Sequence, residues 1–502
     1  MRKLLAALLL LPTLAAPLPL GAQPLRIGLA SDPDILDPTL SRTSAGRVVF
    51  SGMCDKLVEI DAKLNFVPQL ATAWTWQDDG KTLALTLRPG VKFHDGATMD
   101  AAAVQGALQR HLTMQGSTRK AELGPVTAID ATGPLEVKIR LSAPFAPLVA
   151  ALSDRAGMMM SPASAAQTGE GFARAPGCAG PFKFNRRIAQ DRIELERFPD
   201  YWNAKSIAFD AAIYRPIPDA TVRAASLRSG VLDVIEAVNP NDVPDLKADR
   251  RVKVHFGPSL AVNYIAINVG NGKRAEAPLG SSKLVRAALD AAIDRTVLNQ
   301  VAFEGLFTPG NQAVPPGHAF YAESIPVPPR DLAKARALLK QAGFDTVKIQ
   351  MTVPNTSTYR QVSEVLQAMA AEAGIQMELV VTEVATSLKQ WTDGEFESLV
   401  IAWSGRTDID GNIYNFKACG AALNGGRYCN KEVDRLLNLG RQASDQSTRK
   451  RAYAEAAAIY LDERPYIYLW HPVLITGTAA NIDGLQMVPD GLIRPQGLKR
   501  IP

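Results

Sequence analysis

Three short stretches of the chain carry residues that could do covalent chemistry, yet each is better explained by a structural role. Ser117 and Lys120 have the spacing of an acylating Ser-x-x-Lys pair, but the companion motifs of such enzymes are missing. Residues 270–273 (GNGK) resemble part of a phosphate-binding loop but lack its spacing and its final Ser or Thr. His94 and Asp95 could act as a base or as metal ligands, but they lie in a tight turn (FHDG) before a predicted helix. The sequence therefore predicts no catalytic site, and we expect that the protein is not an enzyme.

The N-terminus has the pattern of a secretory signal peptide. Arg2 and Lys3 precede an apolar run over residues 4–11, prolines interrupt the stretch that follows, and small residues end it. We expect residues 1–22 to be removed by cleavage after Ala22, which would deliver the protein to the periplasm. The first cysteine lies far beyond the apolar run, and no later stretch is apolar enough to span a bilayer. We therefore expect a free protein without a lipid anchor.

The four cysteines could hold zinc or form disulfides. No Cys-x-x-Cys pair occurs and the five histidines are scattered, so we expect no metal site and no cofactor. Four cysteines in an exported chain most often form two disulfides, and three pairings are possible. Cys419 and Cys429 enclose a Gly- and Asn-rich loop, which favours a local bridge between them. That pairing leaves Cys54 and Cys178 for a long-range bridge.

Length, composition and charge exclude several classes of protein. The chain has 502 residues, 47% of them hydrophobic and 21% charged, which is typical of a folded protein with two or three domains. The formal net charge of +5 falls to +3 without Arg2 and Lys3, and the remaining Lys and Arg residues are scattered. We therefore expect no binding to nucleic acid.

The order of predicted elements favours an α/β fold. The clearest unit has helices at 331–342 and 359–373 and strands at 347–353, 377–384 and 399–403. Ligands bind beyond the carboxyl ends of the strands in open α/β sheets. Residues 354–356, which include Asn355, and residues 404–406 are therefore expected at a ligand crevice. Residues 55–150 predict a smaller, separate α+β unit.

Ten segments in a fixed order carry a resemblance to a known family. They are SDPDILDP (31–38), CDKLVEID (54–61), PQLATAW (68–74), LRPGVKFHDGATMDAAAV (87–104), GPFKF (180–184), LERFPDYW (195–202), IPDATVRAASLRSGVLDVI (217–235), VRAALDAAIDR (285–295), DLAKARALLKQAGF (331–344) and DERPYIYLW (462–470). Over almost the whole chain after the signal peptide, this order resembles the extracytoplasmic solute-binding proteins of family 5, which serve peptide, nickel and related ABC importers.

The resemblance implies the α/β fold of a two-lobed periplasmic binding protein of the class II type, with an additional small α+β domain. Its lobes are joined by a hinge and close over the ligand. The implied units are the signal peptide at 1–22, lobe I at 23–53, 177–260 and 477–502, the small domain at 54–176, and lobe II at 261–476. The FHDG turn would belong to the framework of the small domain.

One departure from the family pattern concerns the charge at the crevice. Peptide-binding members carry an aspartate three residues after a strand-ending tryptophan, and this aspartate pairs with the α-amino group of the peptide. Here Arg406 follows Trp403 at that spacing. A guanidinium favours a carboxylate over an ammonium. Alternatively, a small deletion shifts the family role to Asp408, or Arg406 pairs with Asp408 itself.

A second departure concerns two of the cysteines. Cys54 stands where the family has an aromatic residue, and Cys178 stands where it has a small one. Both segments line the crevice in the family, so a bridge there would make the cleft wall rigid.

Three further side chains are candidate ligand contacts. Arg155 precedes three methionines, in a segment where family members place an arginine that faces the cleft; the alternative is a surface arginine. Tyr264 either packs in the core or forms an aromatic wall for the ligand. Trp403 ends a predicted buried strand, where its ring can cover an apolar part of the ligand.

We therefore expect the solute-binding component of an ABC importer, which captures a peptide-like or other small anionic or zwitterionic solute by hinge closure. Its partners would be this solute and the ABC permease in the inner membrane, and it would act as a monomer. Two alternatives stay open. One is a receptor of the same family for nickel or a metal chelate, and the other is a periplasmic hydrolase with an unrecognised site.

Overall fold

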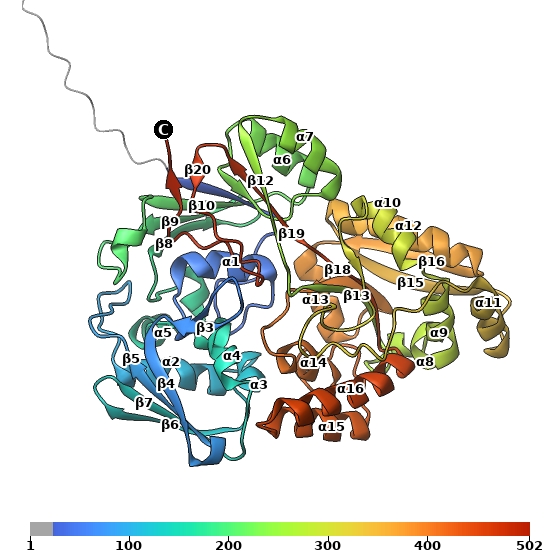
Figure 1. Cartoon of the computed structure of the whole chain (residues 1–502), viewed down its shortest axis with the longest axis horizontal. Helices are drawn as coiled ribbons and strands as arrows, with labels where there is room; N and C mark the ends of the chain where they lie inside the picture. Colours follow the sequence, from blue (N-terminus) through green and yellow to red (C-terminus); the bar gives the residue numbers. More distant parts are fainter. Residues whose placement is uncertain (1–23) are drawn as a thin grey trace, which may run out of the picture.

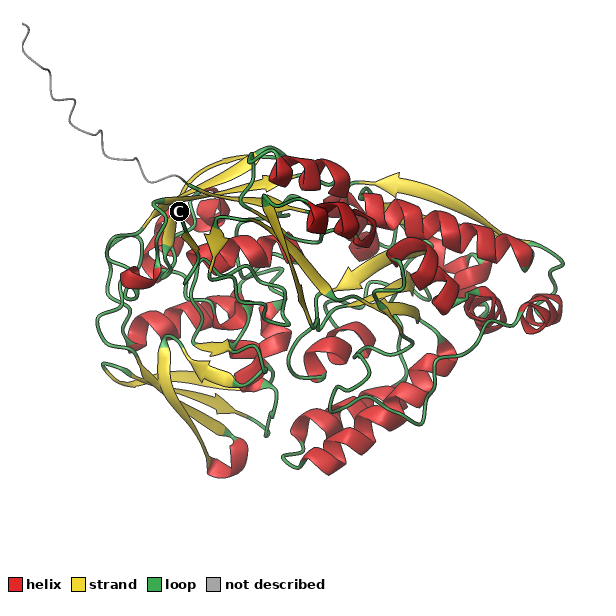
Figure 2. Cartoon of the chain, turned by 45° about the horizontal axis from the view of Figure 1, so that its top comes forward, coloured by secondary structure: helices red, strands yellow, loops and turns green. Residues whose placement is uncertain are grey.

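The computed structural model describes residues 24–502, apart from the side chain of Glu170, and the predicted signal peptide lies outside this range. The described chain forms two lobes and a smaller domain, each built on its own sheet (Figures 1 and 2). Lobe I and the small domain lie on the left of Figure 1, and lobe II lies on the right. The predicted fold class is confirmed.

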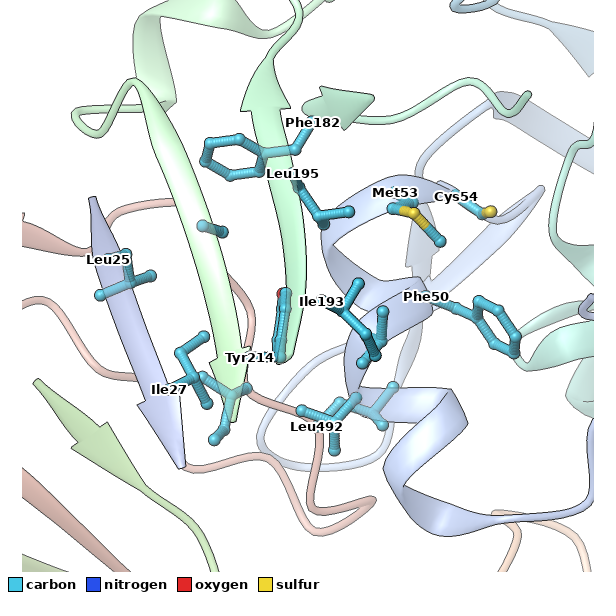
Figure 3. Close-up of a cluster of buried hydrophobic side chains, with 14 of the residues drawn as sticks. Leu25, Ile27, Phe50, Met53, Cys54, Phe182, Ile193, Leu195, Tyr214 and Leu492 are labelled. Carbon is cyan, nitrogen blue, oxygen red and sulfur yellow. The ribbon is translucent and has the colours of Figure 1, made fainter. Parts of the chain in front are cut away.

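Lobe I is built on a seven-stranded sheet. In sheet order its strands are β12 (Val252–Gly257), β19 (Leu474–Ala479), β11 (Val234–Ile235), β1 (Leu25–Leu29), β10 (Ala211–Pro216), β9 (Arg192–Arg197) and β8 (Phe182–Ile188); its helices are α1 (Ser44–Met53), α6 (Ala220–Arg228) and α7 (Val243–Ala248), and β20 (Ile482–Asp483) pairs with β21 (Lys499–Arg500). Alternate apolar residues of the strands, such as Ile193 and Leu195, point toward α1 and pack on Phe50 and Met53 (Figure 3). This period-two pattern is what buries one face of a sheet.

The small domain is a four-stranded antiparallel sheet covered by short helices. Its strands in sheet order are β4 (Ala71–Gln77), β5 (Thr82–Leu87), β7 (Glu136–Leu141) and β6 (Val126–Gly133), with the pair β2 (Val58–Ile60) and β3 (Phe66–Pro68), and its helices are α2 (Ala101–Thr113), α3 (Arg119–Leu123), α4 (Leu148–Leu152) and α5 (Pro162–Thr168). Helix α2 begins after Asp100, whose side chain accepts a hydrogen bond from the amide of Ala103. Gly96, at φ +85°, closes the preceding FHDG turn, which therefore has the framework role expected of it.

Lobe II is built on a six-stranded sheet with helices on both faces. Its strands in sheet order are β14 (Thr308–Pro309), β18 (Tyr466–His471), β13 (Val262–Ile267), β17 (Ser398–Trp403), β15 (Val347–Pro354) and β16 (Ile375–Thr382), and its helices are α8 (Pro278–Ser281), α9 (Lys283–Ala292), α10 (Arg295–Phe303), α11 (Leu332–Gln341), α12 (Ser357–Glu372), α13 (Val384–Asp393), α14 (Asp410–Lys417), α15 (Lys431–Gln442) and α16 (Gln446–Glu463). The predicted βαβ unit is confirmed, because β15 and β16 are parallel and α12 connects them. Asp331 caps α11 and Gly343, at φ +89°, follows its end, as the sequence indicates.

Two short segments connect the lobes. Residues 258–261 lead from β12 of lobe I into β13 of lobe II, and residues 472–473 lead from β18 back into β19. Strand β19 begins at Leu474, a few residues before the boundary at 476/477 that the resemblance implies. We refer to residues 258–261 and 472–473 as the hinge segments.

Candidate functional site

A cavity lies between the lobes and touches both hinge segments. Its volume is about 330 Å³, near the lower end of the range of roughly 300–1,000 Å³ typical of small-molecule sites. Residues of lobe I and lobe II both line it, so its shape changes when the hinge segments bend. The lining comes from the loop after β11, from the C-terminal segment 485–493, from the start of α12, from the end of β17 and from both hinge segments. We call it the interlobe cavity.

Trp403 forms part of the wall of this cavity, where the sequence places it. It ends strand β17, its side chain is buried, and its indole N–H donates to the side-chain oxygen of Asn412 at 2.9 Å. Phe303, Phe307 and Trp470 add further apolar surface. The ring orientation of Trp403 is therefore fixed, and the wall that it forms suits the apolar part of a ligand.

Arg406 lies behind Trp403 and pairs with a carboxylate of the protein itself. Its guanidinium is 4.1 Å from the Trp403 ring centroid, and its Nε is 2.8 Å from Asp154 of the small domain. Burial lowers the pKa of Arg406 to about 9, while the charge of Asp154 opposes that shift. Burial alone would raise the pKa of Asp154, but Arg406 and Arg47 hold it well below its usual range. Asp154 therefore neutralises Arg406, and the alternative pairing of Arg406 with Asp408 is wrong.

Asp408 is also engaged within the protein. Its carboxylate lies 2.7 Å from Arg449 of α16 and accepts the backbone N–H of Asp410 at the start of α14. Asp410, two residues further on, also forms an ion pair within lobe II, with Arg441 at 2.9 Å. This network fixes the loop after Trp403.

Arg155 and Tyr264 lie away from the interlobe cavity. Arg155 is 1% exposed rather than on the surface, and it donates to the backbone oxygen of Ser41 at 2.7 Å. Tyr264 packs edge-on against Tyr466 and Tyr468, with ring centroids 5.0 and 5.8 Å apart, in the core of lobe II. Neither side chain lines the interlobe cavity.

Asn355 lines a second cavity between the lobes. This cavity has a volume of about 160 Å³, and residues 30–34 of lobe I form its opposite wall. The side-chain oxygen of Asn355 accepts two hydrogen bonds from Arg360. The crevice predicted beyond β15 and β17 is thus present, with Asn355 on one cavity and Trp403 on the other.

Charged residues of lobe I that were not predicted from the sequence also line the interlobe cavity. These are Arg42, Arg223, Glu236 and Asp490. For Arg42 the sequence contains one indication. It directly precedes Thr43, the N-cap of α1, and therefore lies at the end of the helix where the backbone amides are free. No local pattern marks the other three, since Arg223 lies on α6, Glu236 directly follows β11 and Asp490 lies in the C-terminal segment after β20.

Both predicted disulfides are present. Cys54–Cys178 and Cys419–Cys429 each have an S–S distance of 2.05 Å. The expectation that Cys54–Cys178 forms part of the cleft wall is wrong. Both cysteines are buried in the core of lobe I, because the end of α1 packs beneath β8 and β9 there.

Within residues 24–502, no group of three or more His, Cys, Asp or Glu side chains is arranged to hold a metal ion. No helix in the same range is long and apolar enough to cross a membrane.

Two lobes, two hinge segments and a cavity between them define a binding protein that closes over a small solute. The model of the bacterial extracellular solute-binding proteins, family 5, matches residues 65–424, and the chain belongs to this family. Membership of this family confirms the prediction of a solute-binding protein that is not an enzyme. It also confirms that the protein is of an extracytoplasmic type.

Individual relatives agree with this assignment. The chain is 30% identical to the glutathione-binding protein GsiB of Salmonella paratyphi A, over 97% of this chain and 96% of that protein. It is 25% identical to the ABC transporter-associated periplasmic binding protein DppA of Helicobacter pylori in complex with the peptide STSA, with a TM-score of 0.87 over 96% and 98% of the two chains. NikA of Staphylococcus aureus in complex with Ni(L-His)2, at 20% identity, shares the fold with a TM-score of 0.85 over 95% and 100%.

Proposed function

We propose that this protein is the periplasmic receptor of an ABC importer and captures one small, peptide-like solute in the interlobe cavity. The observation that carries the proposal is the placement of this cavity across both hinge segments, with walls on both lobes. A solute that touches both walls stabilises the closed state by its higher affinity for it. The inner-membrane permease would then take the solute from the closed form, and the receptor would act as an exported monomer without a lipid anchor.

The size and lining of the cavity favour a short peptide or a molecule of similar chemistry. About 330 Å³ suits a small ligand, and the lining combines aromatic side chains such as Trp403 and Trp470 with hydrogen-bonding residues such as Asn263 and Ser404. Trp403 would cover the apolar part of the solute, with Arg406 and Asp154 bracing it from behind. Asn355, in the neighbouring cavity, would be reached only by a longer solute.

A nickel or metal-chelate ligand is the second candidate, favoured by the structural likeness to NikA with Ni(L-His)2. The side chains that line the interlobe cavity include no histidine and no cysteine. Nickel would therefore have to enter with its nitrogen and sulfur ligands supplied by small molecules, since imidazole is the protein ligand that suits it best.

Native mass spectrometry and calorimetry test the proposal together. The unliganded protein is titrated with glutathione, Met-Leu, Ser-Thr-Ser-Ala and Ni(L-His)2, and each mixture is then analysed for the recovered ligand. We expect one peptide-like molecule per chain, recovered unchanged. Binding of Ni(L-His)2 alone would favour the chelate receptor, and a cleaved product would establish a hydrolase instead.

A further inference from the structure

Four charged side chains line the interlobe cavity, and two of them are already fully engaged by the protein. The guanidinium of Arg223 donates to four backbone oxygens of lobe I, among them that of Ala237 at 2.7 Å. Asp490 pairs with Arg494 at 2.8 Å. The other two, Arg42 and Glu236, are not engaged in this way.

Arg42 keeps most of its hydrogen-bonding capacity free. Its side chain makes one hydrogen bond within the described residues, from Nη1 to Thr392 Oγ1 at 2.7 Å, and no ion pair. A guanidinium has five N–H donors in a fork that matches a carboxylate. Thr392 belongs to α13 of lobe II, so Arg42 reaches across the opening between the lobes. A carboxylate that enters the cavity would find donors here without displacing an internal acid.

Glu236 is a carboxylate with one unused oxygen on the wall of the same cavity. Its Oε1 accepts the amide of Ala30 at 2.9 Å, whereas its Oε2 has no hydrogen-bond partner and no ion pair in the described part of the chain. Burial raises the pKa of Glu236 above its usual value, although the Ala30 amide and the charge of Arg223 oppose that shift. An ammonium group beside Glu236 would lower its pKa again, because the positive charge favours the ionised carboxylate.

The backbone beside Glu236 is held in a strained conformation. Ala237 has φ +49°, in the left-handed region that non-glycine residues seldom adopt, and Arg223 holds its carbonyl oxygen. Such strain persists where the surrounding structure enforces it, and it is enriched at binding sites. The loop that carries Glu236 is therefore set in place before a solute arrives.

Arg42 and Glu236 line one cavity yet form no ion pair with each other. Two opposite charges that line one cavity without pairing with each other attract a ligand with the complementary pair of charges. We infer that Arg42 binds the carboxylate and Glu236 the ammonium of a zwitterionic, peptide-like solute. Both charge-recognition sites of this receptor then lie on lobe I, and the position of Arg406 on lobe II serves the framework instead.

This inference rests on the proposed function, and a titration with capped peptides separates the two. Met-Leu, Ser-Thr-Ser-Ala and glutathione are each used free, N-acetylated and as the C-terminal amide, with calorimetry as the readout. For the wild-type protein, we expect either cap to weaken binding of the preferred peptide by about 10- to 100-fold, the loss that follows from one charge-assisted contact.

The variants assign each cap to one residue. Arg42→Gln should lower the affinity for the free peptide to that for the C-terminal amide, and should leave the affinity for the amide unchanged. Glu236→Gln should lower the affinity for the free peptide to that for the N-acetylated peptide, and should leave the affinity for the N-acetylated peptide unchanged. Arg42→Lys and Glu236→Asp should each retain part of the discrimination, which shows that the fold is intact. Arg336→Gln and Glu432→Gln, on the exposed faces of α11 and α15, are the matched controls and should change nothing.

Three results would count against this account in different ways. If the wild-type protein binds none of the free peptides, the proposed function fails and the inference fails with it. If it binds free and capped peptides equally, the function stands and the inference is wrong. If each variant weakens free and capped forms alike, Arg42 and Glu236 act on the fold rather than on the charges of the solute.

Discussion

The small domain meets lobe I and lobe II through two very different contacts. Against lobe I it is covalently tied near the Cys54–Cys178 bridge, and Glu59 pairs there with the buried Arg494 at 2.9 Å. Its Arg110 also pairs with a lobe I carboxylate, Asp37, at 2.6 Å. We call this contact the fixed junction.

Lobe II meets lobe I and the small domain through fewer polar contacts. They include the Arg406–Asp154 ion pair at 2.8 Å, the Arg42–Thr392 hydrogen bond at 2.7 Å and a backbone bond from Ala146 to Arg441 at 3.1 Å. The two hinge segments are the covalent connections here. We call this contact the closing junction.

The difference indicates which parts move together. The chain connections beside the Cys54–Cys178 bridge and several ion pairs hold the small domain to lobe I as one unit. One ion pair and single hydrogen bonds cross the closing junction, and these can break and re-form as lobe II swings. Solute binding would then act on the closing junction and leave the fixed junction unchanged.

Removal of the Cys54–Cys178 bridge should have the largest effect on the fixed junction. The bridge closes a loop with a sequence separation of 124, for which the chain-entropy model gives about 5 kcal/mol of stability. The double variant C54A/C178A should lose free energy of unfolding on that order in urea titrations. C419A/C429A is the matched control, with a separation of 10, and should lose about 2 kcal/mol less. A larger loss from the control would show that the fixed junction does not depend on its bridge.

The pH dependence of stability should reveal a buried carboxylate at the fixed junction. Asp55 accepts hydrogen bonds from Tyr201 and Trp202, and burial raises its pKa from 3.8 to about 7. The folded state then binds a proton that the unfolded state has lost, so stability is fully present below about pH 4 and falls as the pH rises to about 7.

The comparison of wild type with Asp55→Asn isolates this effect. Each pKa unit corresponds to about 1.4 kcal/mol, so the difference in free energy of unfolding between the two proteins should change by a few kcal/mol between pH 4 and pH 8. Urea titrations across that range provide the measurement. A constant difference would mean that Asp55 stays ionised in the folded protein.

Loss of Arg406 should loosen the closing junction more than the fold. Asp154 keeps Arg47 at 2.9 Å when Arg406 is replaced by Gln, so we expect a cost of about 1–2 kcal/mol, less than for a buried charge left alone. Small-angle scattering of the solute-free variant should show a larger radius of gyration. Arg449→Gln, which breaks a pair inside lobe II, is the control and should leave the radius unchanged. Equal radii for Arg406→Gln and wild type would mean that this pair does not hold the lobes together.

The smallest effect is expected at the edge of the closing junction. Thr392→Val removes the one hydrogen bond that Arg42 makes with lobe II, which is worth about 1 kcal/mol. Solute affinity measured by calorimetry should fall about fivefold, with no change in melting temperature. Thr113→Val, at the exposed end of α2, offers a comparison that should have no effect on affinity.

Local patterns predicted the elements and part of the site. The βαβ unit was predictable because caps such as Asp331 and Gly343 act within a few residues. Trp403 was predictable because a strand end faces the crevice in any open α/β sheet. The partner of Arg406 was not predictable, because Asp154 lies about 250 residues away in the sequence. Only the packing of the small domain against lobe II brings the two side chains together. The internal positions of Arg155 and Tyr264 depend on the same long-range packing.

Hydrogen–deuterium exchange tests the central claim most directly, since it reports on both junctions in one measurement. The protein is compared with and without a saturating amount of the peptide that binds best. We expect slower exchange at residues 236–240, 356–360 and 485–493 around the interlobe cavity, and unchanged exchange at residues 54–60 and 178–182 of the fixed junction. Protection at the fixed junction, or none around the cavity, would contradict the account of a solute held between a rigid two-part unit and a moving lobe II.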